Sequence, residues 1–122
     1  MLFTGIDIIE ISRIEEAITA FGDKFLYRVY TECEVEMYGE KPYSLAARFA
    51  AKESVIKALD ASGKGVSFKE IEILTGPGGK PVVQLRGMAH NLAQALGVVR
   101  FNISLSHSRD NAVAMVIAET MS

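Results

Sequence analysis

One acidic residue lies in a run of branched apolar residues near the N-terminus. Asp7 follows Ile6 and precedes Ile8 and Ile9. A carboxylate buried without a partner is costly, so Asp7 should have a cation or a hydrogen-bond donor beside it, or a raised pKa. The alternative is a strand-end residue that points into water. A helix cap is excluded, because the next helix is expected to begin near Glu10, too far along the chain for its amides to reach Asp7.

A second group of charged residues lies in a segment with helical spacing. Lys52 falls in the middle of an apolar stripe, and Glu53 and Lys57 lie four residues apart on the neighbouring stripe, together with Ala46 and Ala50. The two alanines leave room for a metal ion or a ligand beside this acid and base. The alternative is an exposed Glu–Lys pair that contributes ~0.3–0.5 kcal/mol, with the stem of Lys52 along the core and its ammonium in water. The apolar stripe consists of Leu45, Phe49, Ile56 and Leu59.

A third group, residues 104–108, combines three serines with the imidazole of His107, and Arg109 follows directly. Hydroxyls, imidazole and above all guanidinium groups are natural ligands of phosphate. A serine hydrolase is disfavoured, because the sequence has no G-x-S-x-G turn. Taken alone, His107 is more typical of a hydrogen-bonded histidine at the end of a strand.

Arg13, Lys24 and Arg28 form a fourth, cationic group. Lys24 and Arg28 are four residues apart, and Arg13 projects from a predicted helix on the side opposite its isoleucines. Glutamates at positions 10, 15 and 16 lie close in sequence, so a solvated face is the simplest interpretation. The sharper hypothesis is a surface for an acidic protein partner.

Apolar periodicity and turn residues predict the elements that must position these groups. Thr31 and Glu34 form a capping box that opens a short helix ending at Gly39, and Pro42 suits the first turn of a long helix. Helices are predicted over 10–21, from Thr31 to Gly39, over 42–59 and over 88–96. Strands are predicted over 2–9, 66–74, 81–85, around 101–106 and after the polar turn at 108–111. The expected fold class is α+β, with amphipathic helices packed on a small antiparallel sheet.

Composition limits the classes of protein to which the chain can belong. With 122 residues and 49% hydrophobic residues, it is expected to form a single domain, 1–122, with one core. A net charge of −2 argues against a general nucleic-acid binder, and the single cysteine fits a reducing compartment, so we expect a cytoplasmic protein. The longest apolar run is too short to cross a membrane. The expected radius of gyration, about 14 Å, is too small for one copy to enclose a long ligand.

Several motifs together resemble the 4′-phosphopantetheinyl transferases, and most closely their short holo-acyl-carrier-protein synthase branch. The two main blocks are residues 5–14 (GIDIIEISRI) and residues 48–53 (RFAAKE), the second followed by Lys57-Ala58-Leu59. Three further blocks fit in order: Arg28-Val29-Tyr30-Thr31 with Glu34, Gly79-Lys80-Pro81, and 103–107 (ISLSH). One departure is the loop at 60–65 (DASGKG), where the family commonly has a G-T-G-like sequence.

The resemblance implies transfer of the phosphopantetheine arm of coenzyme A to a serine of an apo acyl carrier protein, with adenosine 3′,5′-bisphosphate as the other product. Asp7 and Glu53 would hold Mg²⁺ on the diphosphate, and Lys57 would neutralise that diphosphate. The serine proton would go to Glu53 or to a water on the metal, and the sequence leaves both open. Cofactor contacts are implied for Arg48 along the groove, for His107 at the 3′-phosphate and for Gly63 in the variant loop.

The resemblance also implies partners. Arg13 would face the acidic recognition helix of the carrier protein, and Lys24 and Arg28 would extend that surface. Members of this branch are homotrimers with sites between subunits, and a second subunit would supply the wall that a small domain lacks. The rival hypotheses are a non-catalytic α+β binding module and a Mg²⁺-dependent nuclease. The charge of −2 and the lack of a basic stripe argue against the nuclease.

Overall fold

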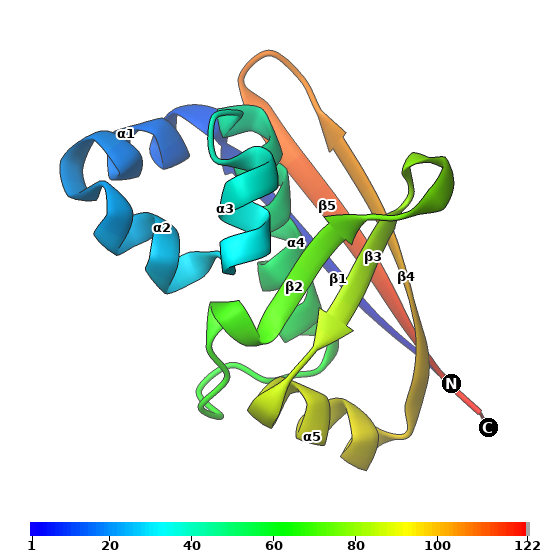
Figure 1. Cartoon of the computed structure of the whole chain (residues 1–122). Helices are drawn as coiled ribbons and strands as arrows, with labels where there is room; N and C mark the ends of the chain where they lie inside the picture. The colour runs from blue at the N-terminus through cyan, green and yellow to red at the C-terminus, as the bar shows by residue number, and fades with distance from the viewer. Residues whose placement is uncertain (122) are drawn as a thin grey trace.

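A three-stranded antiparallel sheet forms one layer of the protein, whose computed structural model describes residues 1–121. The strand order is β1–β5–β4, so the first and last strands of the chain are hydrogen-bonded neighbours. This pairing brings both termini to one end of the sheet (Figure 1). The strands are β1 (Leu2–Glu10), β4 (Val98–His107) and β5 (Asn111–Thr120).

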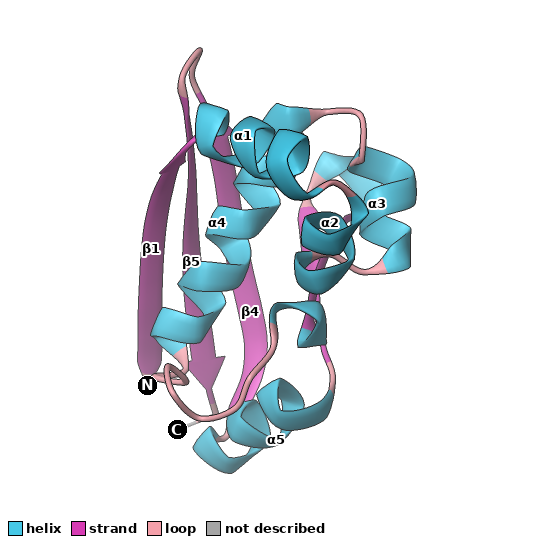
Figure 2. Cartoon of the chain, turned by 90° about the vertical axis from the view of Figure 1, so that its left-hand side faces the viewer, coloured by secondary structure: helices cyan, strands magenta, loops and turns pink. Residues whose placement is uncertain are grey.

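Helix α4 (Pro42–Ala58) lies across one face of this sheet (Figure 2). Proline occupies its first turn, as predicted, because a first-turn amide needs no helical partner. Small side chains allow the close approach. A β-carbon at Gly5 would overlap the carbonyl oxygen of Ser54, so only glycine fits there. On β5 the fully buried residues under the helix are Ala112, Ala114, Val116 and Ala118.

The opposite face of the same sheet exposes large apolar side chains. Leu2, Ile6 and Ile8 on β1 are 59–65% exposed, and Met115 on β5, which lies opposite Ile6, is 41% exposed. Alternation along a strand requires this arrangement, because Phe3, Gly5, Asp7 and Ile9 point to the α4 face. We call Ile6, Ile8 and Met115, with Val113 and Ile117 beside them, the outer apolar face.

A separate hairpin packs beside α4. It consists of β2 (Ile71–Thr75) and β3 (Pro81–Leu85), joined by a 3₁₀ turn at Pro77–Gly79. The predicted strand over 66–74 is therefore wrong in its first half. A capping box between Ser67 and Glu70 folds Phe68–Glu70 into a 3₁₀ turn, and the strand starts only at Ile71.

Three helices connect β1 to α4, and a fourth follows the hairpin. The capping box of Thr31 and Glu34 is confirmed, and one helix was not predicted from the sequence, α2. The helices are α1 (Ile11–Phe21), α2 (Asp23–Val29), α3 (Glu32–Tyr38) and α5 (Gly87–Leu96). The α+β class is confirmed. Within residues 1–121, no helix is both long and apolar enough to span a bilayer.

Candidate active site

Asp7 and Lys57 form an ion pair between β1 and α4. Asp7 lies in the middle of β1 on the face towards the helix, and the Lys57 ammonium is 3.0 Å from its Oδ1. The same ammonium donates a 2.9 Å hydrogen bond to the backbone oxygen of Ile6. The alternative of a strand-end acid pointing into water is therefore wrong. The side chain of Asp7 is only 19% exposed, and it has the cation that a partly buried carboxylate needs.

Glu53 is the second acid at this contact. Burial raises its pKa above the ordinary value, the charge of Asp7 raises it further, and Lys57 opposes both effects. The alternative of an exposed ion pair between Glu53 and Lys57 is wrong, because in the described chain Lys57 makes its ion pair with Asp7 instead. The site thus holds two carboxylates and one ammonium, a net negative charge that only partial burial makes tolerable.

Ser54, the neighbour of Glu53, fixes the helix at this point. Its hydroxyl lies 2.8 Å from the carbonyl oxygen of Ala50 and 3.0 Å from that of Ala114 on β5. Together with the close approach at Gly5, this contact sets both the height and the rotation of α4 over the sheet. Glu53 and Lys57 are thereby held on the β1 side of the helix.

The donor set fits a hard divalent cation. Magnesium takes one or two protein carboxylates and completes its shell with water and substrate phosphates. Asp7 and Glu53 supply two carboxylates, and Lys57 supplies one ammonium beside them. Nowhere in residues 1–121 do three or more Asp, Glu, His or Cys side chains gather as an all-protein metal cage would require. The arrangement suits a cation that a phosphorylated substrate shares.

His107 lies at a different edge of the sheet. It ends β4, and its ring contacts that of Tyr43, with centroids 5.1 Å apart. Both residues line a cavity of about 830 Å³ at the tip of the β4–β5 hairpin, which Ser108 and Arg109 also line. This large cavity does not include the two acids. The two acids and this cavity are therefore separate features of one protomer.

Arg48 is buried, and its guanidinium contacts other residues of the same chain. Its guanidinium lies 3.5 Å from the ring centroid of Tyr38, and its Nε donates a 3.1 Å hydrogen bond to the carbonyl oxygen of Ile73. Arg48 also borders a cavity of about 140 Å³ that it shares with Tyr43 and His107. Of the predicted cofactor residues, Arg48 and His107 are therefore brought together, on the β4 side of α4.

The predicted site residues form two groups in one protomer. Asp7, Glu53 and Lys57 lie at the β1 edge, whereas His107 and Arg48 lie towards β4, and β1 and β4 are the two outer strands of the sheet. Two strand spacings of ~4.8 Å, together with α4, separate the groups. One protomer therefore holds the predicted site residues in two separate groups.

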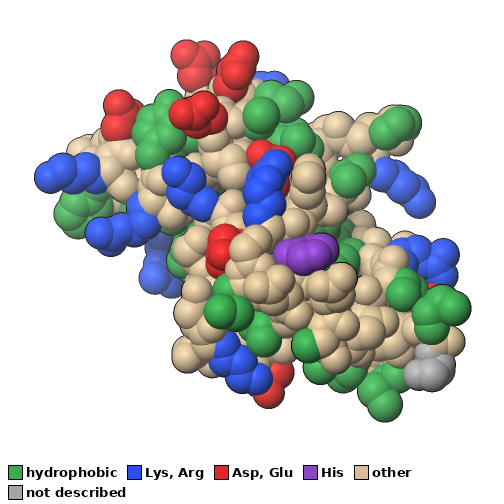
Figure 3. Space-filling view, turned by 60° about the horizontal axis from the view of Figure 1, so that its bottom comes forward, with side chains coloured by type: hydrophobic (Ala, Val, Ile, Leu, Met, Phe, Trp, Pro, Cys, Tyr) green, Lys and Arg blue, Asp and Glu red, His purple; other side chains and the backbone are tan. Residues whose placement is uncertain are grey.

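Gly63 and the predicted cationic residues are all exposed. Gly63 lies in the loop after α4 with φ of +75°, a conformation that suits glycine. Arg13 lies on α1, and Lys24 and Arg28 lie on α2. Figure 3 shows lysine and arginine side chains gathered on its left, the side of α1 and α2, with hydrophobic side chains beside them. Over the rest of that view the basic side chains are scattered and form no continuous stripe.

Sequence reasoning missed Tyr43 and Ser54. Tyr43 follows Pro42 in the first turn of α4, and Ser54 is an ordinary helical serine by pattern. Only the packing of α4 on the sheet places the Tyr43 ring on His107 and the Ser54 hydroxyl on the carbonyl oxygen of Ala114. The one signal in the sequence that could have pointed to Tyr43 is an aromatic residue directly after the proline that opens the helix.

Two carboxylates and an ammonium lie between a strand and a helix of this α+β fold, and comparisons with known proteins identify the family. The family model of the 4′-phosphopantetheinyl transferase superfamily matches residues 4–116. The holo-[acyl-carrier-protein] synthase of Dehalococcoides mccartyi (strain CBDB1) is 50% identical over 119 residues, covering 98% of this chain and 99% of that protein. The chain belongs to the 4′-phosphopantetheinyl transferase superfamily, as its motifs indicated.

Solved structures agree with this assignment. The holo-[acyl-carrier-protein] synthase of Helicobacter pylori, in complex with coenzyme A, is 33% identical and has a TM-score of 0.85. The match covers 95% of this chain and 99% of that one. The synthase of Bacillus anthracis, in complex with CoA (3′,5′-ADP), is 36% identical with a TM-score of 0.76, over 97% and 96% of the two chains. Both share the α+β fold described above.

Proposed function

We propose that this chain is a holo-[acyl-carrier-protein] synthase, which transfers 4′-phosphopantetheine from coenzyme A to a serine of an apo acyl carrier protein. The observation that carries the proposal is the group of Asp7, Glu53 and Lys57 at the β1–α4 contact, in a chain whose relatives bear that name at up to 50% identity over nearly their full length. These relatives favour the transferase over a non-catalytic binding module or a Mg²⁺-dependent nuclease.

The reaction exchanges one phosphorus–oxygen bond for another. The carrier serine oxygen attacks the phosphorus that bears the pantetheine, the bond to the second phosphate breaks, and adenosine 3′,5′-bisphosphate leaves. Crowded negative charge on the diphosphate is the main obstacle to this step. The Lys57 side chain is 52% exposed, so its ammonium can donate to a diphosphate oxygen while it stays near Asp7.

Glu53 is the proton acceptor by its position, because it is the second carboxylate beside Asp7 and Lys57. Burial raises the pKa of its carboxyl in the cation-free protein, and a bound cation would lower that pKa again. The serine proton passes to a Glu53 oxygen, which neutralises a carboxylate that already stands beside Asp7. Asp7 and Glu53 are also the residues that would hold Mg²⁺. When bound, that cation supplies charge neutralisation on the diphosphate.

The carrier protein would dock on the α1–α2 side. Arg13, Lys24 and Arg28 are exposed there, and the apolar side chains of Phe21 and Tyr27 are 65% and 43% exposed beside them. Cations around apolar anchors suit an acidic helix with an apolar stripe. Loop residue Gly63 and cavity-lining Arg48 and His107 would contact the cofactor.

A homotrimer would complete the site. The outer apolar face exposes Ile6 and Ile8, and each protomer carries its acids and its His107 on different edges of the sheet. Association that buries this face would remove the exposed apolar area from water and bring the acids of one protomer near His107 of another. We propose that each chain of the trimer is a single catalytic domain. We also propose that the protein works in the cytoplasm, where the exposed thiol of Cys33 stays reduced.

One assay tests the activity directly. The purified protein is mixed with coenzyme A, Mg²⁺ and an apo acyl carrier protein, and the carrier is weighed by mass spectrometry. The carrier should gain one phosphopantetheine arm, EDTA should prevent the gain, and excess Mg²⁺ should restore it. Glu53→Gln should fold and give no transfer, whereas Glu36→Gln, an exposed acid on α3, should react as the wild type does. No mass gain with carriers of several types would overturn the proposal.

A further inference from the structure

On the edge of β2 that faces away from β3, the backbone groups are hydrogen-bonded to side chains of α3 and α4. In the described chain β2 pairs only with β3, yet its alternate residues carry backbone groups that are buried against α3 and α4. Buried backbone groups need partners, and here side chains replace the missing strand. Lys52 donates to the carbonyl oxygen of Ile71, Arg48 donates to that of Ile73, Glu34 accepts from the Ile73 amide at 2.8 Å, and the Tyr38 hydroxyl accepts from the Thr75 amide at 3.0 Å.

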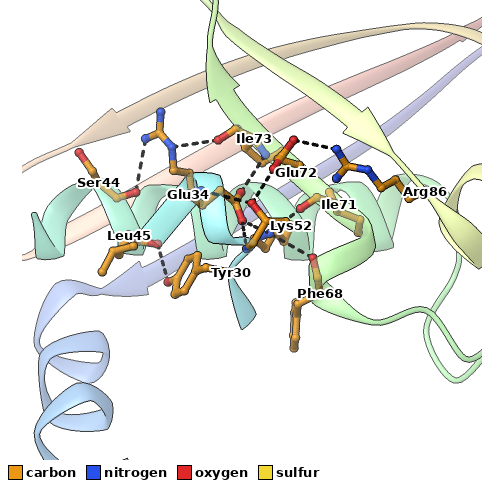
Figure 4. Close-up of polar contacts among 12 residues, drawn as sticks. Tyr30, Glu34, Ser44, Leu45, Lys52, Phe68, Ile71, Glu72, Ile73 and Arg86 are labelled. Carbon is orange, nitrogen blue, oxygen red and sulfur yellow. Dashed lines mark hydrogen bonds and ion pairs between the residues drawn. The ribbon is translucent and has the colours of Figure 1, made fainter. Parts of the chain in front are cut away.

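The centre of this edge is a fully buried ion pair. The ammonium of Lys52 lies 2.8 Å from Glu34 Oε1, and both side chains are 0% exposed. Lys52 spends its three protons on Glu34, on the carbonyl oxygen of Phe68 and on that of Ile71 (Figure 4). Glu34 accepts from Lys52, from the Thr31 amide and from the Ile73 amide. The sequence-based expectation that the Lys52 ammonium reaches water is therefore wrong.

Stability alone does not account for such a pair. Removing two charges from water costs about as much as their attraction returns, and apolar residues of similar volume often serve as well or better. The best-attested role of buried ionic groups is to fix one register between packed elements. Lys52 has three hydrogen-bond partners, on α3, on the 3₁₀ turn Phe68–Glu70 and on β2, so it favours one rotation and one height of α4 against them.

That rotation matters because Lys52 immediately precedes Glu53. Neighbouring helical residues point about 100° apart, so Lys52 facing β2 turns Glu53 towards β1. Lys57, one turn further on, meets Asp7 on the same β1 side. The helix is thus held from two sides, by the side chains of Lys52 and Arg48 on β2, and by Gly5 and Ser54 on the sheet.

We propose that Lys52, through its buried pair with Glu34, is a positioning residue for phosphopantetheine transfer that fixes the orientation of Glu53 beside Asp7. This rests on the proposed function. Lys52 touches neither substrate nor cation, because its side chain is fully enclosed. Its contribution is to hold an acid within the narrow geometry that the transfer step tolerates, where a displacement of about 1 Å can cost 10²-fold in rate.

The test compares Lys52→Met, which keeps the length of the side chain and removes its donors, with Lys69→Met, which removes an exposed lysine from the 3₁₀ turn before β2. All assays run well below each melting temperature, with folding checked by circular dichroism. Lys52→Met should lower kcat by about 10²-fold, and leave the KM for the carrier protein unchanged, because the α1–α2 surface is untouched. Lys69→Met should match the wild type in both constants.

A second readout does not depend on turnover. Mn²⁺ is titrated into each protein in the presence of coenzyme A and free Mn²⁺ is measured by electron paramagnetic resonance. Lys52→Met should bind Mn²⁺ about 10-fold more weakly, the size of effect seen when the support of a metal ligand is lost. A merely structural lysine would lower the melting temperature and change neither Mn²⁺ binding nor kcat, and that result would overturn the proposal.

If Lys52→Met does not fold, Glu34→Gln takes its place. Glutamine removes the negative charge opposite Lys52 and offers one acceptor oxygen where Glu34 uses two. With that oxygen at the Oε1 position, the capping box and the contact with Lys52 can persist, and the Ile73 amide loses its acceptor. Folded Glu34→Gln should again show a lower kcat and weaker Mn²⁺ binding at an unchanged carrier KM, and wild-type values would overturn the proposal. Failure of the proposed function is distinguishable, because the wild type would then give no mass gain of any carrier protein, whatever Lys52→Met does to Mn²⁺ binding.

Discussion

The ammonium of Lys57 pairs with Asp7 on β1, at 3.0 Å, although Glu53 stands one helical turn before it on the same helix. The pair joins residues that are 50 positions apart in the sequence. Because Lys57 is half exposed, the pair itself contributes little to folding, about 0–1 kcal/mol. Because Lys57 pairs with Asp7, the negative charge of Glu53 is only partly offset. The site therefore keeps a carboxylate that can accept a proton or bind a cation.

Replacement of Asp7 by asparagine should separate binding from folding. Asp7→Asn keeps the size of the side chain and removes one of two carboxylates, so kcat/KM for coenzyme A should fall by about 10²–10³-fold. The melting temperature should change little, because the lost ion pair is weak. Steady-state kinetics with thermal melts, using Glu36→Gln as the matched control, checks both. Near-wild-type kcat/KM in Asp7→Asn would remove Asp7 from the site.

The raised pKa of Glu53 predicts a stability effect with a definite sign. A carboxyl whose pKa is higher in the folded state than in the unfolded state stabilises the fold at low pH, and this contribution is lost as the pH rises through the folded-state pKa. Glu53→Gln should therefore be more stable than the wild type at neutral pH in EDTA. The gain should vanish below about pH 4, where an ordinary glutamate is itself protonated.

Thermal melts of the two proteins across this pH range measure the difference. The measurement is made without metal, because a bound cation would favour the ionised carboxylate and reverse the sign at neutral pH. Equal melting temperatures at neutral pH would show that Glu53 is not penalised by its burial and by Asp7.

Local patterns in the sequence predicted the elements that depend on neighbours in the chain. Thr31 and Glu34 are three residues apart, so their capping box and the helix that it opens were predictable, as was the alternation that defines β4. The seven-residue helix α2 escaped detection, because two turns contain too few apolar residues to establish a period. The start of β2 was predicted too early, because the apolar residues of 66–74 resemble a strand while the capping box of Ser67 and Glu70 folds Phe68–Glu70 into a 3₁₀ turn.

The partners of the charged residues could not be predicted from spacing. Asp7 and Glu53 were identified as candidates by their unusual surroundings, but the partner of Lys57 lies on a different element. Lys52 was expected to reach water because an unpaired buried lysine is costly. Its actual partner, Glu34, is 18 residues away, and only the tertiary fold brings the two together.

The cationic residues on α1 and α2 predict salt-sensitive binding of the carrier protein. Arg13→Glu should raise the KM for the carrier about 10-fold at low salt and leave the KM for coenzyme A unchanged, because Arg13 lies outside the β1–α4 contact. The difference from the wild type should shrink as ionic strength rises. Lys69→Glu makes the same change of charge elsewhere and should have no such effect. If the KM for the carrier protein changes neither in Arg13→Glu nor with ionic strength, this docking surface is excluded.

The outer apolar face predicts that assembly and activity are lost together. Ile8 is 65% exposed in the protomer, so Ile8→Asp should leave the protomer folded. A buried, unpaired carboxylate at an interface costs several kcal/mol, enough to dissociate the assembly. Light scattering should show a trimer for the wild type and a monomer for Ile8→Asp, with transfer activity lost in the monomer because Asp7 and His107 of one protomer lie at different edges of its sheet. Val82→Asp, on the exposed side of β3, is the control and should remain trimeric and active. A wild-type monomer at all concentrations, or an active Ile8→Asp monomer, would show that one chain holds the complete site.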